Sequence, residues 1–187
     1  MAGLIQRHGP PALRRTRNAF ASLGSAIISQ QLSGAVVRTI RKRFVDLYGN
    51  GRFPTPQALL DTPFERLRGV GLSRAKVASL LDLAQKFVDG TVRPKRFSHM
   101  EEAEIASELC QVRGIGPWSV HMFLIFGLLR PDVLPVGDLG VQKGVQAYFG
   151  LRNLPDARTM EAHTIPWRPY RSIGSWYMWR LLEESRS

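Results

Sequence analysis

Apolar residues recur at helical spacing along most of the chain, and this pattern constrains the fold more than any other feature. Three stripes repeat every three or four residues, the spacing that places side chains on one face of a helix. No segment keeps a sustained period-two alternation, so the sequence predicts an all-α fold of about nine or ten short helices. The stripes consist of Phe20, Leu23, Ile27 and Ile28, of Val37, Ile40, Phe44 and Leu47, and of Val77, Leu80, Leu81, Ala84 and Phe87.

Turn residues separate these stripes. The second stripe ends at residues 48–51 (Tyr-Gly-Asn-Gly) and the third at Asp89-Gly90, where a glycine can end a helix. Thr55-Pro56 and Thr62-Pro63 predict helices that begin with proline at the first position, where a missing backbone N–H does no harm.

Length and composition exclude several classes of protein. The 187 residues suffice for one compact domain or two small lobes, and 44% of them are apolar, which argues against wholesale disorder. The longest apolar run, residues 122–129, is too short to cross a bilayer, and the first residues lack the apolar segment of a signal peptide. The single cysteine, Cys110, excludes an internal disulfide and a four-cysteine metal site. We therefore expect a cytoplasmic protein with no membrane contact.

Positive charge is concentrated in the first part of the chain. The formal net charge is +11, and residues 1–52 hold nine basic residues against one acid, Asp46. Such a charge favours a polyanionic partner, of which nucleic acid is the commonest. The alternative is an arginine-rich surface with no such partner.

Two segments place a Gly-apolar-Gly turn between helical stretches, at residues 67–75 (LRGVGLSRA) and 112–120 (VRGIGPWSV). They predict two helix–hairpin–helix units. Gly114 and Gly116 can adopt backbone conformations closed to other residues, and Pro117 suits the start of the next helix. The free N–H groups at that helix start can bind a phosphate oxygen whatever the base sequence. The first copy is equally compatible with an ordinary turn.

An aspartate follows the second hairpin, within the turn Pro-Val-Gly-Asp-Leu-Gly at residues 135–140. Asp138 can cap a helix that starts at Leu139. If buried beside the hairpin, its carboxylate could also act chemically on whatever the hairpin holds. Local sequence alone favours the cap, although the two roles are compatible.

Together these motifs resemble the helix–hairpin–helix (HhH-GPD) DNA glycosylase superfamily, and most of all its 3-methyladenine DNA glycosylase II branch. The second hairpin and Asp138 match the hairpin plus Gly/Pro…Asp signature of that family. The resemblance covers residues 18–184 with the motifs in the right order. Three further segments carry it: residues 27–33 (IISQQLS), 71–76 (GLSRAK) and 167–180 (WRPYRSIGSWYMWR).

The resemblance implies two helical lobes with the active-site cleft between them. Residues 17–130 would form the lobe with the hairpin, and residues 1–16 plus 131–187 the lobe with Asp138 and the aromatic C-terminal helix. The implied partner is double-stranded DNA containing alkylated bases, bound by a monomer that would be nucleoid-associated in a bacterium. The target nucleotide must flip out, because its glycosidic bond is inaccessible inside stacked DNA.

Asp138 is the catalytic residue that the resemblance implies. Its carboxylate would stabilise positive charge on the sugar while water hydrolyses the bond to an alkylated base such as 3-methyladenine. The family often has a second acid beside it, where this chain has Gly137. Bifunctional relatives carry a nucleophilic lysine at the position of Trp118, so the chain is expected to be monofunctional, without AP-lyase activity, and to leave an abasic site.

The resemblance also implies a base pocket formed by Trp118, Met122 and Trp179. Electron-rich rings attract a cationic purine, which suits an alkylated base. Packing in a core remains the alternative for Met122 and Trp179, because both lie in apolar helical segments.

DNA contacts are implied at two places. Gln31 and Leu32 match the family's minor-groove wedge, although Leu32 could equally be a core residue at a helix end. At the second hairpin, four residues are expected to contact DNA: Gly114, Ile115, Gly116 and Ser119.

No cofactor is expected to be required. The family's hairpin can bind a structural Na⁺ or K⁺ through backbone carbonyls, and by position these belong to Cys110, Val112 and Ile115.

Two other functions fit parts of the sequence. A non-catalytic helix–hairpin–helix DNA-binding module would need the hairpins and the charge, but not Asp138 or the aromatic C-terminal helix. A glycosylase for oxidised or mismatched bases would share the fold, but the lack of a hairpin lysine and of cluster cysteines argues against it.

Overall fold

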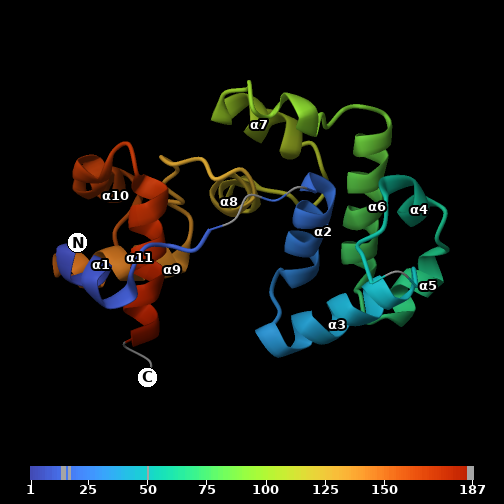
Figure 1. Cartoon of the computed structure of the whole chain (residues 1–187), viewed down its shortest axis with the longest axis horizontal. Helices are drawn as coiled ribbons and strands as arrows, with labels where there is room; N and C mark the ends of the chain where they lie inside the picture. The colour runs from blue at the N-terminus through green and yellow to red at the C-terminus, as the bar shows by residue number, and fades with distance from the viewer. Residues whose placement is uncertain (14–15, 17, 50, 185–187) are drawn as a thin grey trace. The chain divides into compact units, whose positions relative to one another are not determined.

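The computed structural model describes residues 1–13, 16, 18–49 and 51–184, and within these ranges every regular element is a helix. The all-α prediction is therefore confirmed (Figure 1). The chain forms two compact units, one of residues 16–120 and one of residues 1–15 together with 121–187. We call them the hairpin unit and the aspartate unit. None of the described helices has the length and apolar character needed to cross a membrane.

The hairpin unit is built around α6 (Arg74–Val88), which packs against α2, α4 and α5. The apolar stripes predicted from the sequence supply its core, and Leu23, Ile27 and Leu80 are among the most deeply buried residues. Figure 1 shows α2 and α6 side by side. The other elements are α2 (Ala19–Ser29), α3 (Gly34–Asp46), α4 (Pro56–Leu60), α5 (Phe64–Gly69), η1 (Pro94–Arg96), α7 (Glu102–Leu109) and the start of α8 (Pro117–Met122).

The two predicted proline starts differ in detail. At α4 the prediction is confirmed, because Pro56 is the first helical residue and the Thr55 hydroxyl accepts the Ala58 N–H at 3.2 Å. At α5 the prediction is wrong by one residue. Pro63 is the N-cap, since its carbonyl accepts the first helical hydrogen bond, from the Leu67 N–H at 3.2 Å. Asn50, predicted to lie in a turn, is outside the described residues.

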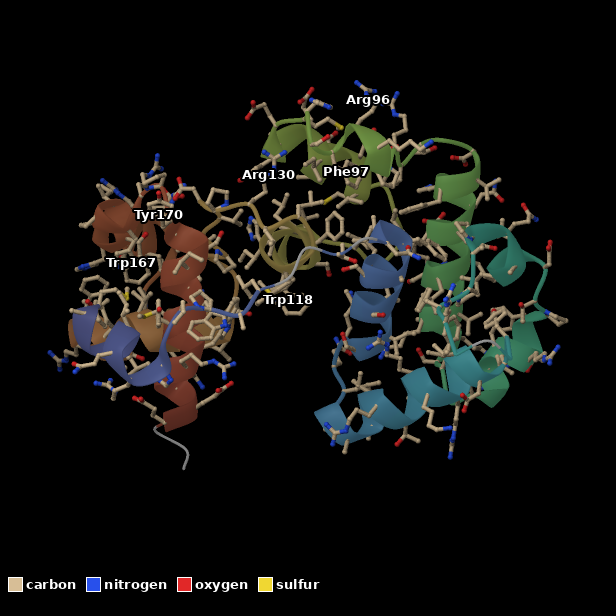
Figure 2. All side chains as sticks on the ribbon, in the orientation of Figure 1. Arg96, Phe97, Trp118, Arg130, Trp167 and Tyr170 are labelled. Carbon is tan, nitrogen blue, oxygen red and sulfur yellow. The ribbon has the colours of Figure 1, made fainter. Side chains whose placement is uncertain are left out.

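The aspartate unit is organised by the packing of α9 (Leu139–Phe149) against α11 (Arg171–Glu184). The two helices approach very closely at Gly144, where a Cβ would lie only 2.7 Å from the Met178 backbone oxygen. The remaining elements are α1 (Ala2–His8), the π-turn η2 (Phe123–Gly127), α10 (Ala157–Thr164) and η3 (Ile165–Trp167). In the same unit, Trp167 packs against Phe149 with ring centroids 5.9 Å apart, whereas Tyr170 is exposed (Figure 2).

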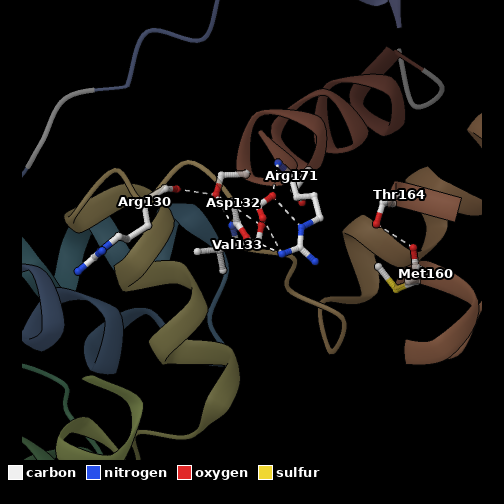
Figure 3. A network of polar contacts seen from close by, with 8 residues as sticks. Arg130, Asp132, Val133, Met160, Thr164 and Arg171 are labelled. Atoms are coloured by element: carbon white, nitrogen blue, oxygen red, sulfur yellow. Dashed lines mark hydrogen bonds and ion pairs between the residues drawn. The ribbon is translucent and has the colours of Figure 1, made fainter. Parts of the chain in front are cut away.

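A polar network fastens the start of α11 to the segment that leads toward Asp138 (Figure 3). The Arg171 guanidinium donates to both carboxylate oxygens of Asp132, at 2.7 and 2.8 Å. The Ser172 hydroxyl donates to the Arg130 carbonyl at 2.6 Å and accepts the Val133 N–H at 2.9 Å. The first turn of α11, at Arg171 and Ser172, therefore holds both ends of the loop formed by residues 130–133.

Candidate functional site

Asp138 is a buried carboxylate at the start of α9, with 8% of its surface exposed. Its Oδ1 accepts two hydrogen bonds, from the Val141 backbone N–H at 2.8 Å and from the Trp179 indole N–H at 2.9 Å. The first is the helix cap expected from local sequence. The second joins the aspartate to the C-terminal helix and fixes the direction in which the carboxylate points.

Trp179 reaches Asp138 because α9 has no side chain in the way. A Cβ on Gly140 would lie 2.9 Å from Trp179 Cδ1 and 3.0 Å from both Trp179 Nε1 and Asp138 Oδ1. The Trp179 ring lies 5.4 Å from that of Phe126, centroid to centroid, at an interplanar angle of 31°. Phe126 lies in the π-turn η2, where the Leu128 N–H bonds to the Phe123 carbonyl at 3.0 Å. Such turns often occur at functional sites.

A hollow of about 270 Å³ lies beside Trp179 in the aspartate unit. Its rim carries an ion pair between Arg180 and Glu183, 2.7 Å apart, and the Arg180 guanidinium lies over the Trp176 ring. Met122 does not line this hollow and is half-buried at the end of α8. The lining residues are Phe126, Gly140, Trp176, Trp179, Arg180, Leu182 and Glu183.

The Gly-x-Gly pattern of the second hairpin predicts an unusual backbone conformation at both glycines, and only one of them has it. Gly114 has a φ of +77°, and a Cβ there would also lie 2.7 Å from the Ser79 hydroxyl oxygen. Gly116 has no positive φ and has open space where a Cβ would lie. The expectation that both glycines need a conformation closed to other residues is therefore wrong for Gly116. The Arg113 N–H donates to Asp82 of α6 at 2.7 Å, which fixes the hairpin to its supporting helix.

Trp118 lies in the hairpin unit, in the first turn of α8, with 41% of its surface exposed (Figure 2). It lines a groove of about 470 Å³ that includes both the hairpin and the predicted wedge. The structure thus brings together residues from separate sequence motifs. The groove is formed by Ser29, Gln30, Gln31, Gly114, Gly116, Pro117, Trp118 and Ser119.

The predicted wedge residues lie in a loop after α2, residues 30–33, which we call the wedge loop. Gln31 and Leu32 are both exposed, Leu32 by 37%, so the reading of Leu32 as a core residue is wrong. Gln31 has a left-handed backbone with φ +56°. Ser119, predicted to contact DNA, is only 4% exposed, and its hydroxyl accepts a hydrogen bond from the Gln30 amide at 3.2 Å.

The cation site at the carbonyls of Cys110, Val112 and Ile115 stays a prediction. The Val112 carbonyl accepts the Ile115 N–H at 3.0 Å, and a carbonyl oxygen has a second lone pair for an ion. Ile115 is itself 6% exposed, so its backbone rather than its side chain is the part that could reach DNA or an ion. In the described part of the chain, no three His, Cys, Asp or Glu side chains form a cluster suited to a metal.

Sequence reasoning missed several residues of the site. Phe126 stood in an apolar run that indicated only burial, and the effect of Gly140 depends on α11, far along the chain. Lys76, which directly follows the first Gly-x-Gly segment, donates to the carbonyls of Ile28 and Gln30. No pattern in the sequence marks a lysine whose partners are backbone carbonyls.

Comparisons with known proteins agree with this geometry. The sequence is 30% identical over 188 residues to "Putative DNA-3-methyladenine glycosylase YfjP" of Bacillus subtilis, covering 98% of this chain and 66% of that protein. It is 32% identical over 178 residues to "DNA-3-methyladenine glycosylase 1" of Schizosaccharomyces pombe, covering 95% of this chain and 78% of that one.

Among solved structures, a Schizosaccharomyces pombe 3-methyladenine DNA glycosylase in complex with abasic DNA superposes with a TM-score of 0.85. The two chains are 31% identical, and the match covers 96% of this chain and 89% of that one. The family model described as "HhH-GPD superfamily base excision DNA repair protein" matches residues 25–169. With the hairpin, the buried aspartate and the wedge loop in place, these matches show that the chain belongs to the HhH-GPD superfamily of base excision DNA repair proteins.

Proposed function

We propose that this protein is a monofunctional DNA glycosylase that removes alkylated bases, such as 3-methyladenine, from double-stranded DNA and leaves an abasic site. Three kinds of support converge: the family, the relatives that carry this activity in their names, and the environment of Asp138. The environment of Asp138 is the observation that supports this proposal most strongly. Asp138 is 8% exposed at the head of α9, and its Oδ1 accepts from the Val141 N–H and from the indole of Trp179, a residue that also lines the aromatic hollow.

The proposed chemistry needs one negative charge near the sugar. The bond between C1′ and the base nitrogen breaks, and its electron pair goes to the base, which turns a cationic alkylpurine into a neutral leaving group. The positive charge left on the sugar is stabilised by the Asp138 carboxylate. Water then adds to C1′ and loses a proton to the carboxylate or to solvent. No separate acid is needed for a base that departs neutral, which agrees with Gly137 in place of a second acid.

The test is Asp138→Asn, because an asparagine oxygen can keep the hydrogen bonds from Val141 and Trp179 while the charge is lost. The matched control is Asp156→Asn, which alters the cap of α10, where Asp156 accepts the Thr159 N–H at 2.8 Å. Release of free 3-methyladenine from methylated duplex DNA is followed under single-turnover conditions. We expect Asp138→Asn to be slower by about 10²–10³-fold, the usual loss for a preorganised electrostatic group, and Asp156→Asn to match wild type. Equal rates for Asp138→Asn and wild type would exclude the assignment.

The proposal of a monofunctional enzyme rests on Trp118, whose indole cannot form a Schiff base with the sugar. Incubation with methylated DNA and borohydride should trap no protein–DNA adduct, and the abasic strand should stay intact until alkali is added. A lysine-bearing relative serves as the positive control. A trapped adduct would contradict this part of the proposal.

The choice of alkylated bases is supported by the paired rings of Phe126 and Trp179, since a cationic purine is attracted to aromatic faces. A panel of duplexes with methylated, oxidised and mismatched bases tests it. Release from the methylated duplex alone is expected. Tight binding with no release from any substrate would favour a non-catalytic DNA-binding module instead.

We further propose that the protein acts as a cytoplasmic monomer and requires no cofactor. A Na⁺ or K⁺ ion held by the carbonyls of Cys110, Val112 and Ile115 would bridge the hairpin to a phosphate and take no part in the chemistry. Affinity for duplex DNA measured in sodium, potassium and tetramethylammonium salts at equal ionic strength tests the ion.

A further inference from the structure

Lys76 occupies a position that its sequence context does not explain. It lies in the first turn of α6, directly after the first Gly-x-Gly turn, where a lysine would ordinarily be assigned to a DNA phosphate. Its ammonium group instead donates to the backbone carbonyls of Ile28, at 2.6 Å, and Gln30, at 2.8 Å. Burial lowers the pKa of this lysine, which agrees with a side chain turned inward.

The two carbonyls belong to the C-terminal end of α2, which closes at Ser29 with Gln30 as its cap. The last carbonyls of a helix have no partner within the helix, and they form the negative end of its dipole. A lysine ammonium donates hydrogen bonds to these carbonyls and places a positive charge at the negative end of the dipole. Lys76 therefore fixes the point at which α2 ends and the wedge loop begins.

A second set of hydrogen bonds, from the Gln30 side chain, holds the start of the wedge loop. The Gln30 side-chain amide donates to the Gly114 carbonyl at 2.9 Å and to the Ser119 hydroxyl at 3.2 Å. Gln30 is thus held through its backbone by Lys76 and through its side chain by the second hairpin. The next residue, Gln31, turns into the left-handed region and leads to the exposed Leu32.

The helix that carries Lys76 also carries the supports of the second hairpin. Ser79 packs beneath Gly114, and Asp82 accepts the Arg113 N–H at 2.7 Å. Residues 76, 79 and 82 are three apart and so lie along one side of α6. One helix face therefore sets the spacing between the wedge loop and the hairpin.

We propose that Lys76 is a positioning residue, which holds the wedge loop in register with the second hairpin so that both can engage one duplex. It makes no phosphate contact. The inference rests on the proposed function only in assuming that the loop enters DNA beside a flipped nucleotide. Loss of Lys76 should therefore weaken binding to DNA that needs the wedge and spare binding to DNA that does not.

The test compares Lys76→Met with Lys95→Met, which removes the same charge from an exposed site in the same unit. Two duplexes are titrated, one undamaged and one with a tetrahydrofuran abasic-site analogue next to 2-aminopurine. Wedge insertion unstacks the 2-aminopurine and raises its fluorescence. The salt dependence of affinity for the undamaged duplex is measured in parallel.

For Lys76→Met we expect about tenfold weaker affinity for the abasic duplex and a smaller fluorescence rise, because two hydrogen bonds to a charged group are lost. Affinity for undamaged duplex should fall less than threefold, with an unchanged salt slope. A lysine on a phosphate would instead lower the slope by about 0.9 and weaken both duplexes alike. That result would overturn the inference, as would wild-type affinity and fluorescence in Lys76→Met.

Two further measurements keep the test decisive. If circular dichroism shows that Lys76→Met does not fold, Gln30→Met replaces it, because this variant removes the side-chain hydrogen bonds to Gly114 and Ser119. It should weaken binding to the abasic duplex and spare binding to the undamaged one. Unchanged binding in Gln30→Met would then count against the inference. All these readouts use binding alone, so wild-type protein that releases no methylated base would contradict the proposed function without affecting this result.

Discussion

Substitution of Gly140 by alanine should damage the candidate site through a single added carbon. The new Cβ would lie 2.9 Å from Trp179 Cδ1 and 3.0 Å from Trp179 Nε1 and Asp138 Oδ1. The 2.9 Å separation is shorter than Cβ contacts in real proteins and the two at 3.0 Å are unusually tight, so the Trp179 ring must shift. Because that ring donates to Asp138 at 2.9 Å, its displacement breaks one of the two bonds that hold Oδ1.

Three contributions set the size of the effect. Overpacking costs about 1–3 kcal/mol, and a lost hydrogen bond to a charged group costs about 1.5–3 kcal/mol. Against these, alanine in place of glycine stabilises a helix by up to about 1 kcal/mol. The net destabilisation is therefore about 1.5–5 kcal/mol, which lowers the Tm of a chain of this size by roughly 3–20 °C.

The control is Gly137→Ala, three residues earlier, where an added Cβ meets nothing within 4 Å and the φ is not positive. Thermal unfolding by circular dichroism gives the Tm of each variant, and release of 3-methyladenine gives its activity. Gly137→Ala should match wild type in both. Gly140→Ala should unfold earlier and release base at least tenfold more slowly, because the carboxylate loses its orientation. If Gly140→Ala equals Gly137→Ala in Tm and rate, the argument from Trp179 to Asp138 is refuted.

Two other perturbations give further expected outcomes. Gly144→Ala would bring a Cβ within 2.7 Å of the Met178 backbone oxygen, which cannot move aside as a side chain could. It should destabilise the fold by about 3 kcal/mol or more, and an unchanged Tm would disprove the close approach of α9 and α11. The Arg171 guanidinium holds the pKa of Asp132 below its usual range. The stability from this pair should be complete above about pH 4 and lost as pH falls through the lowered pKa. The Tm difference between wild type and Asp132→Asn should accordingly shrink between pH 6 and pH 3, and a constant difference would contradict the assignment.

Local patterns predicted the helices well, because helix formation depends on near neighbours. The stripe containing Leu23 and Ile27 became α2, Thr55-Pro56 became the start of α4, and Asp138 became the cap of α9 as its position before Leu139 suggested. The Gly-x-Gly pattern of the second hairpin also pointed to a left-handed backbone, and one of its two glycines, Gly114, has it.

The contacts that shape the site could not be predicted in this way, because each joins residues far apart in the sequence. The indole of Trp179 binds a carboxylate 41 residues away, and Lys76 binds carbonyls 46 and 48 residues away. A backbone carbonyl has no sequence signature, so a lysine that binds one resembles any other lysine. Gly116 illustrates the converse: its presence in a Gly-x-Gly pattern suggested a special backbone that it does not have.

The left-handed backbone at Gln31 bears on whether the wedge can be separated from its protein. A residue with a side chain adopts φ +56° against its intrinsic preference, so the surrounding contacts impose that shape. A free peptide of residues 30–33 would relax out of it. Transplanting the wedge loop onto another DNA-binding scaffold would accordingly need more than its four residues. A helix placed like α6, with its lysine, and a hairpin carbonyl to receive the Gln30 amide would have to move with them.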